Sequence, residues 1–167
     1  MEIERNMEIE RKYLVEQLPQ HYQLYKFHSI QQGYLCTSPV VRIRKEDQDY
    51  YLTYKGSGLL AREEYNLPLT KEAYEHLVQK IDGILLSKRR YRIPLSDAYS
   101  SSLPKPKHTD GLMIELDIFE GIYQGLVLAE VEFPSVEEAQ HFAPPSWFGR
   151  DVTLSGEYQN SKLSAGK

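Results

Sequence analysis

The sequence predicts an all-β-dominated (α+β) fold, in which eight antiparallel strands form a sheet or a closed barrel with a few peripheral helices. Eight short runs rich in Val, Ile, Leu and Tyr are separated mostly by short, turn-like connections, as is typical of antiparallel strands. Most of these runs alternate polar and apolar residues, which places each kind of side chain on its own face of a strand. The strands are expected at residues 8–15, 30–35, 40–46, 50–55, 61–69, 84–93, 112–119 and 126–133.

Helices are expected only at the periphery. Thr70 is placed to cap a helix over residues 71–80, because its hydroxyl can accept a backbone N–H of the first turn. Ser135 precedes a shorter helix over residues 136–142 in a capping-box pattern. A last helical turn is expected within residues 158–163, and residues 96–111 are expected to form a long loop.

The composition indicates one globular domain over residues 1–167, with its core in 7–163. Of the 167 residues, 41% are hydrophobic and 26% are charged, which is ordinary for a folded domain. The net charge of −4 gives no electrostatic reason to expect binding to nucleic acid or to an anionic membrane. Cys36 is the only cysteine, so neither an intrachain disulfide nor a cysteine-cluster metal site is possible. Because no membrane-spanning run and no signal peptide are recognised, a cytoplasmic location is expected.

The N-terminus contains a near repeat, since residues 1–6 (MEIERN) almost match residues 7–12 (MEIERK). Only the second copy continues into a strand-like apolar run. We interpret the first copy as an extension or an alternative start; a doubled strand is the other interpretation.

Charged residues occur in like-signed pairs, two positions apart, on several of the expected strands. The strands at 40–46, 50–55 and 84–93 present cations, whereas those at 112–119 and 126–133 present acids. Solvent-exposed faces more often mix the two signs, because like charges side by side repel. We therefore favour an inward orientation of the charged faces, with the apolar faces forming an outer wall partly covered by helices. The alternative is that every charged face meets water.

An inward orientation would gather cations and acids inside one structure. The basic set is Lys12, Arg42, Arg44, Lys55, Arg62, Lys88 and Arg90, and the acidic set is Glu8, Glu10, Glu64, Glu115, Asp117, Glu130 and Glu132. So many ions cannot occupy a dry core, because burying uncompensated charge is prohibitive. The interior is therefore expected to hold water and a highly charged ligand. The basic set would bind a polyanionic substrate such as a chain of phosphates, and the acidic set would bind a hard divalent metal, Mg²⁺ or Mn²⁺.

The ordered series of these residues resembles the CYTH superfamily, the triphosphate tunnel metalloenzymes. Its first motif is Glu-x-Glu-x-Lys, present here as Glu8, Glu10 and Lys12. The match continues through Gln32-Gly33-Tyr34-Leu35, Arg42-x-Arg44, Lys55, Arg62-x-Glu64, Lys88-x-Arg90, Glu115-x-Asp117, Glu130-x-Glu132 and Tyr158-x-Asn160. The resemblance implies a closed eight-stranded antiparallel tunnel that binds a triphosphate and cleaves it with a divalent metal.

Two positions depart from the family pattern. Asn66 stands where many relatives would carry an acid, which affects one contact to metal or water. Residues 154–157 lack the basic side chains expected there, so the closure of the tunnel end is expected to differ.

The expected activity is metal-dependent hydrolysis of a small triphosphate, with inorganic tripolyphosphate split to pyrophosphate and phosphate as the leading hypothesis. Thiamine triphosphatase and class IV-type adenylate cyclase are alternatives that would use the same site, and a non-catalytic polyphosphate-binding module is an alternative of another class. The sequence shows no aromatic–glycine motif for a base or thiamine ring, and binding a polyanion does not by itself require acids. The expected partner is a small triphosphate, without nucleic acid or membrane, and the protein is expected to be a monomer or a homodimer. The expected catalytic residues are Lys12, Glu8, Glu10 and Arg62.

Overall fold

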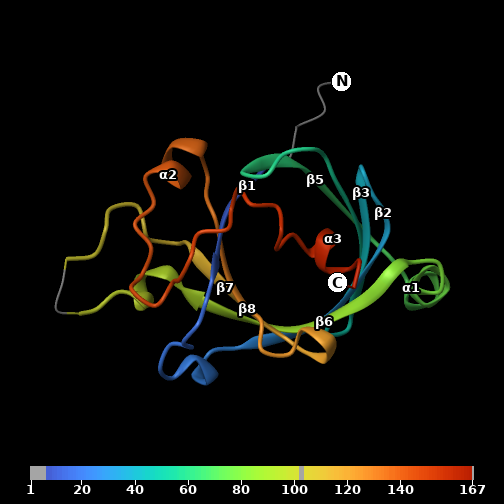
Figure 1. The fold of residues 1–167 in the computed structure, drawn as a ribbon, viewed down its shortest axis with the longest axis horizontal. Coiled ribbons are helices and arrows are strands. Elements are labelled where there is room, and N and C mark those ends of the chain that lie inside the picture. The colour runs from blue at the N-terminus through green and yellow to red at the C-terminus, as the bar shows by residue number, and fades with distance from the viewer. Residues whose placement is uncertain (1–6, 102–103, 167) are drawn as a thin grey trace.

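The eight strands close into a barrel with the order β1-β5-β4-β3-β2-β6-β7-β8, and every neighbouring pair is antiparallel (Figure 1). The predicted fold class is thereby confirmed. The protein is represented by a computed structural model, which describes residues 7–101 and 104–166. The strands are β1 (Met7–Leu14), β2 (Phe27–Thr37), β3 (Val40–Glu46), β4 (Asp49–Lys55), β5 (Ala61–Pro68), β6 (Asp82–Pro94), β7 (Met113–Phe119) and β8 (Val127–Glu132). The near repeat at residues 1–6 lies outside the described residues.

Three short α-helices occur where the sequence predicts them: α1 (Lys71–Val78), α2 (Val136–Gln140) and α3 (Asn160–Leu163). The side chains of Thr70 and Ser135 accept hydrogen bonds of 3.1 Å from the backbone N–H groups of Ala73 and Glu138, so both predicted N-caps are confirmed. Both capped helices end two residues before the predicted limits, as is common at helix ends. In the part of the chain that is described, no helix combines the length and the apolar character needed to cross a bilayer.

The expected loop at residues 96–111 is wrong at its beginning, where the chain forms a 3₁₀ helix, η2 (Leu95–Ala98). Leu95 is fully buried in the hydrophobic core, which holds this turn against the barrel. Two more 3₁₀ helices, η1 (Tyr22–Leu24) and η3 (Gly121–Tyr123), lie in connections between strands.

The first strand bridges two neighbours and leaves a seam in the barrel wall. β1 pairs with β5 over Met7–Ile9 and with β8 over Glu10–Leu14. Beyond the β5 pairing, the C-terminal segment joins β1: Val152 N donates to Lys12 O, and Lys12 N donates to the hydroxyl of Thr153, both at 2.9 Å. These bonds satisfy backbone groups of β1 that the split pairing would otherwise leave without partners.

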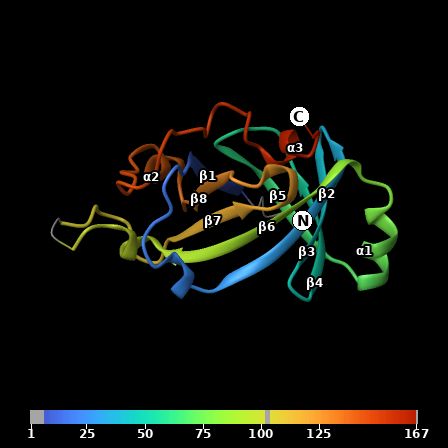
Figure 2. The same cartoon turned by 60° about the horizontal axis from the view of Figure 1, so that its bottom comes forward.

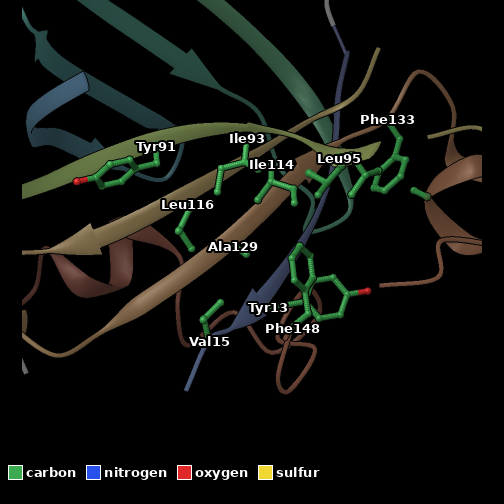
Figure 3. Close-up of a cluster of buried hydrophobic side chains, with 12 residues drawn as sticks. Tyr13, Val15, Tyr91, Ile93, Leu95, Ile114, Leu116, Ala129, Phe133 and Phe148 are labelled. Atoms are coloured by element: carbon green, nitrogen blue, oxygen red, sulfur yellow. The ribbon is translucent and has the colours of Figure 1, made fainter. Parts of the chain in front are cut away.

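The main hydrophobic core lies outside the barrel, behind the wall formed by β6, β7, β8 and β1 (Figure 3). The apolar residues of these strands alternate with the charged ones, so they point away from the barrel interior. Helix α2 and the segment that follows it cover this face, with Ala139 and Phe148 packed into the cluster. The buried strand residues are Tyr13, Tyr91, Ile93, Ile114, Leu116, Ala129 and Val131. The predicted outward orientation of the apolar faces is confirmed for this wall.

Helix α3 lies at one end of the barrel (Figures 1 and 2). A second cluster of buried apolar side chains packs there and closes this end. Toward this end the inner positions change from charged to apolar: Glu130 gives way to Leu128 on β8, Asp117 to Phe119 on β7, and Lys88 to Leu86 on β6. Leu163 of α3 packs on this cluster. The end is therefore sealed by apolar packing.

Gly83 is required where the C-terminal segment docks on β6. Its φ is +69°, and a Cβ at this position would lie 2.0 Å from the carbonyl oxygen of Ser164. That carbonyl accepts the neighbouring Ile84 N–H at 2.8 Å, so the segment cannot retreat without losing this bond. Any side chain at residue 83 thus opposes docking of α3.

We predict that Gly83→Ala lowers the free energy of unfolding by more than the roughly 1–2 kcal/mol of left-handed strain alone, because the clash is added to it. The matched control is Gly111→Ala, which has a similar φ of +78° and nothing within 4 Å of the added Cβ. Urea denaturation gives the two free energies, and hydrogen exchange should show faster exchange at residues 158–166 only in Gly83→Ala. Equal effects of the two variants would contradict the docking role.

Candidate active site

The barrel interior contains a cavity lined mainly by charged side chains. Among the described residues, six basic and six acidic side chains line it: Lys12, Arg42, Arg44, Lys55, Arg62 and Arg90, with Glu8, Glu10, Glu64, Glu115, Glu130 and Glu132. All twelve belong to the sets selected from the sequence; of the remaining two, Lys88 and Asp117 are buried beside this lining. Because the two signs balance without a ligand, a bound polyanion would need accompanying cations to preserve neutrality.

The arginines of β3 form the basic side of the cavity. Gln32 Oε1 accepts two hydrogen bonds from Arg44, from Nε at 2.9 Å and from Nη2 at 2.5 Å, which orient the guanidinium plane. Burial and the neighbouring Arg44 lower the pKa of Arg42 to about 10. Arg42 Nε and Gln32 Nε2 are buried donors without a hydrogen-bond partner in the described structure. Arg42 and Arg44 line the cavity, so an anion bound there would accept from these guanidinium groups and relieve the repulsion between them.

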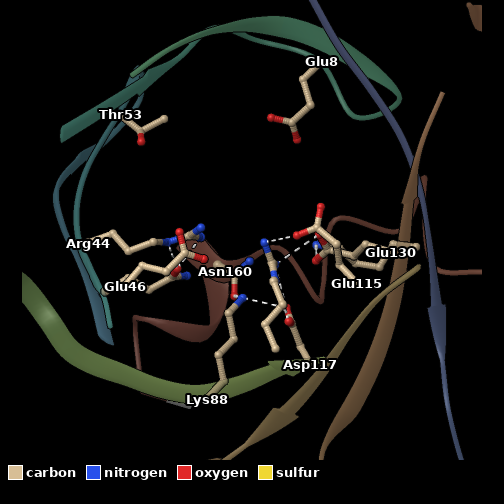
Figure 4. A network of polar contacts seen from close by, with 12 residues as sticks. Glu8, Arg44, Glu46, Thr53, Lys88, Glu115, Asp117, Glu130 and Asn160 are labelled. Atoms are coloured by element: carbon tan, nitrogen blue, oxygen red, sulfur yellow. Dashed lines mark hydrogen bonds and ion pairs between the residues drawn. The ribbon is translucent and has the colours of Figure 1, made fainter. Parts of the chain in front are cut away.

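Asp117 holds a buried pair of cations together (Figure 4). Lys88 Nζ lies 2.7 Å from Asp117 Oδ2, and Arg90 donates to both carboxylate oxygens at 2.7 and 2.8 Å. Burial would raise the pKa of Asp117, but Arg90 and Lys88 hold it below the usual range. Burial and the Arg90 guanidinium lower the pKa of Lys88 to about 7, against the opposing effect of Asp117. The carboxylate therefore acts as the counter-ion of this pair.

Lys55 links the basic and acidic sides. Its ammonium lies 2.8 Å from Glu8 Oε2 and 3.3 Å from Glu64 Oε2. Burial and nearby Arg42 lower the pKa of Lys55 to about 8, although Glu8 opposes this shift. Burial would raise the pKa of Glu8, but Lys55 and Arg62, the latter opposite it on β5, hold that pKa below the usual value.

The acidic wall on β7, β8 and β1 places carboxylates directly opposite one another. Glu10 faces Glu132 across one strand pair, and Glu115 faces Glu130 across the next. Burial, Glu130 and Glu8 raise the pKa of Glu10 well above its usual range, and burial, Glu8 and Glu115 raise that of Glu132. Opposing carboxylates repel one another, and a divalent cation that takes oxygen ligands would relieve this repulsion. The residues present therefore fit Mg²⁺ or Mn²⁺.

These acids do not form a ready-made metal cage. Across residues 7–101 and 104–166, no three Asp, Glu, His or Cys side chains converge on a position that could hold a metal ion. Mg²⁺ is commonly held by one or two carboxylates, with water and substrate oxygens completing its coordination. The arrangement therefore suits a metal that is bound together with an anionic substrate.

Lys12 lies at the junction between the acidic wall and the C-terminal segment. Its ammonium is 3.4 Å from Glu130 Oε1 and donates to the carbonyl oxygen of Tyr158 at 3.3 Å. Burial would lower the pKa of Lys12, but Glu130 and Glu10 raise it above the usual value. Burial would raise the pKa of Glu130, but Lys12 and Arg90 hold it well below its usual range. Both partners are thus charged, and Lys12 presents a cation within the cavity.

Several uncharged residues at the site received no role in the sequence analysis, although Gln32, Tyr34 and Asn160 occur in the family series. Tyr34 and Asn160 line the cavity, and Asn160 Oδ1 accepts a hydrogen bond from Lys88 Nζ at 3.3 Å. Strand alternation was a usable signal for Gln32 and Tyr34, which share a face of β2, and for Thr53, which shares a face of β4 with Lys55. For Asn160 the signal was its place in the Tyr158-x-Asn160 element of the family series, and its approach to the cavity depends on the tertiary packing of α3.

A closed antiparallel barrel with its charges inside defines a class of proteins that bind a charged ligand in the barrel interior. The chain belongs to the CYTH domain family, whose model matches residues 6–164.

The relatives of this chain include two proteins named inorganic triphosphatase. The one from Nitrosomonas europaea is 38% identical over 162 residues, covering 94% of this chain and 96% of the relative. The one from Acetivibrio thermocellus is 34% identical over 161 residues, covering 93% of this chain and 92% of the relative.

Solved structures show the same architecture. A crystal structure of an inorganic triphosphatase matches with a TM-score of 0.65 and 33% identity, over 96% of this chain and 95% of that one. A crystal structure of a putative adenylate cyclase from Bacillus halodurans matches with a TM-score of 0.53 and 17% identity, over 83% of this chain and 86% of that one. The second likeness concerns the fold alone.

We predict that Asp117→Asn destabilises the protein by about 3–5 kcal/mol at neutral pH, because it leaves Lys88 buried without its counter-ion and removes one of the three acidic partners of Arg90, which keeps Glu115 and Glu130. The matched control is Glu75→Gln, which removes an exposed partner of Lys71 and should cost less than about 1 kcal/mol. Urea denaturation measures both. Similar small losses would show that the Asp117 contacts contribute little.

The same variant should reveal the pH dependence of this cluster. Because the pKa of Asp117 is lowered on folding, its stabilisation is present above the unfolded value of about 3.9 and is lost as the pH falls through the folded pKa. The stability difference between wild type and Asp117→Asn should therefore shrink as the pH falls below about 3.9; closer to neutrality it also contains the titration of Lys88, whose pKa of about 7 would fall further without Asp117. A difference that keeps growing below about pH 3.9 would contradict the assignment.

Proposed function

We propose that this protein is a metal-dependent triphosphatase that hydrolyses inorganic tripolyphosphate to pyrophosphate and phosphate inside the barrel. The observation that carries the proposal is that one cavity contains both a buried arginine donor without a hydrogen-bond partner, Arg42 Nε, and pairs of carboxylates that face each other across strands. The first suits an anion and the second suits a divalent cation bound with it. The names of the two relatives, which align with nearly the whole chain, support the same activity. A linear triphosphate satisfies such a cavity by charge alone and requires no pocket for a base.

The basic residues would bind the triphosphate. Arg42 and Arg44 present guanidinium groups from one wall, and their fork geometry suits pairs of phosphate oxygens. The other proposed contacts are Lys12, Lys55, Arg62, Lys88 and Arg90. Lys88 is fully buried, so we assign it the innermost charge of this set.

The acidic residues would hold Mg²⁺ or Mn²⁺. Glu8, Glu10, Glu130 and Glu132 are the proposed main ligands, and Glu115 lies close enough to contribute. Glu64 and Asp117, also selected from the sequence, contact cations and are assigned supporting roles as counter-ions. A bound divalent ion supplies charge neutralisation at the phosphate oxygens and makes water more acidic.

The protein's own residues would position the reaction without a covalent intermediate. Phosphoryl transfer depends mainly on alignment and charge neutralisation, so no protein nucleophile is required. Lys12 would stabilise charge on the attacked phosphoryl group, and its contacts with Glu130 and with Tyr158 O hold its ammonium in place. Arg62 stands opposite Glu8 and would neutralise charge at the same end of the substrate.

We predict that the protein releases phosphate from tripolyphosphate with Mg²⁺ or Mn²⁺, and that chelation abolishes turnover until metal is restored. Glu10→Gln should raise the metal concentration for half-maximal rate by about tenfold or more, because it removes a proposed ligand. Its matched control is Glu16→Gln, at an exposed position just beyond β1. Rates measured with tripolyphosphate, thiamine triphosphate and ATP, including cyclic AMP release, decide the substrate. Preference for either organic triphosphate, or unchanged metal dependence in Glu10→Gln, would contradict the respective assignment.

We further predict that Lys12→Ala retains the fold but loses about a hundred- to thousand-fold in kcat, as expected on removal of one group that stabilises developing charge. Lys71→Ala, at an exposed position on α1, is the matched control. Thermal unfolding checks the fold, and steady-state phosphate release gives kcat. A folded Lys12→Ala protein with near wild-type turnover would limit Lys12 to pairing with Glu130.

A further inference from the structure

An uninterrupted chain of hydrogen bonds connects the basic side of the cavity to Glu64. Arg42 Nη2 donates to Thr53 Oγ1 at 3.0 Å, and Thr53 Oγ1 donates to Asn66 Oδ1 at 2.6 Å. Asn66 Nδ2 then donates to Glu64 Oε1 at 2.9 Å, and the other oxygen of Glu64 lies 3.3 Å from Lys55 Nζ. Residues 53 and 66 are direct partners across β4 and β5, so the strand register itself brings them together.

The donor-to-acceptor direction of this series of hydrogen bonds is determined by the groups at its two ends. A guanidinium group can only donate hydrogen bonds, and an ionised carboxylate can only accept them. A side chain between them must therefore accept on one side and donate on the other. The carboxamide of Asn66 does both, whereas an ionised aspartate would meet Glu64 with a second negative charge and no hydrogen to donate.

We propose that Asn66, acting through Thr53, is a positioning residue for the triphosphate site. It orients the Arg42 guanidinium toward the substrate. It also keeps Glu64 turned to Lys55 as a counter-ion and unavailable to a divalent metal. The inference rests on the proposed function and assigns a role to the position at which this chain departs from the family pattern.

The location of Asn66 makes the inference testable. Thr53 is fully buried, but Asn66 is exposed at the far end of the chain of bonds, so its replacement leaves the core intact. An aspartate there would stand two residues from Glu64 on the same face of β5, the spacing that Glu8 and Glu10 have on β1. The substitution thus converts a counter-ion into half of a carboxylate pair.

The first experiment measures binding of Mn²⁺ alone to Asn66→Asp by electron paramagnetic resonance. Release of Glu64 and addition of a second carboxylate should tighten Mn²⁺ binding by about tenfold or more, and calorimetry without metal should show weaker binding of tripolyphosphate. The matched control is Gln124→Glu, which adds the same charge at an exposed turn beside η3 and should change neither affinity.

The second experiment compares Thr53→Val with Thr53→Ser. Thr53→Val removes the hydroxyl that accepts a hydrogen bond from Arg42 but keeps a side chain of similar volume. The KM for tripolyphosphate should therefore rise about two- to tenfold, with a smaller change in kcat. Serine keeps the hydroxyl and should restore the wild-type KM. A purely structural role would lower thermal stability in both variants without this split between KM and kcat.

The inference is overturned if Asn66→Asp and Gln124→Glu bind Mn²⁺ equally, or if Thr53→Val binds tripolyphosphate as wild type does. Failure of the proposed function has a different result, which is that wild type hydrolyses none of the triphosphates tested. In that case the Mn²⁺ affinities of the two charge variants still decide whether Asn66 controls Glu64.

Discussion

Charge compensation inside the barrel is the constraint on which the rest of this structure depends. A buried ion without a partner costs several kcal/mol, so the interior can hold charged side chains only in matched sets. Asp117 pairs with both Lys88 and Arg90, Glu115 and Glu130 also pair with Arg90, and Glu8 compensates Lys55 on the opposite side. What remains incompletely compensated is the facing pair Glu10 and Glu132 and the adjacent arginines Arg42 and Arg44. Those groups would gain most from a bound anion and metal.

Turning the charges inward obliges the strands to present their apolar faces outward, and these faces must then be covered. Helix α2 and the segment leading to Phe148 cover the wall on which the acids stand. The same C-terminal region then joins β1 at Thr153 and seals one barrel end with Leu163. One stretch of chain therefore covers the outer core, completes the wall and closes the cavity. The charged interior depends on this stretch, although the stretch itself contributes few charged groups.

The balance of signs in the cavity explains why substrate and metal belong together. The lining contains equal numbers of acidic and basic residues among those described, so either ligand alone disturbs neutrality. A triphosphate accompanied by a divalent cation adds both signs at once, and phosphate oxygens can complete a coordination shell that the protein leaves open. This view accounts for the lack of a preformed three-ligand metal site in the described chain. It is also consistent with membership of the CYTH domain family.

The sequence by itself determined the strands and which charged residues share a face, because these follow from a period of two that is local to each strand. The sorting of like charges by strand favoured the inward orientation, and the closed barrel decided it. Arg42 and Arg44 must share a face wherever β3 is placed. Only the tertiary structure decided which charged side chains form ion pairs with each other, as Asp117 does with Lys88 and Arg90, and which remain available to a ligand. It alone also brought Asn160 to the cavity. Strand register and docking of the C-terminal segment arise from contacts between residues far apart in the chain, and no local periodicity records them.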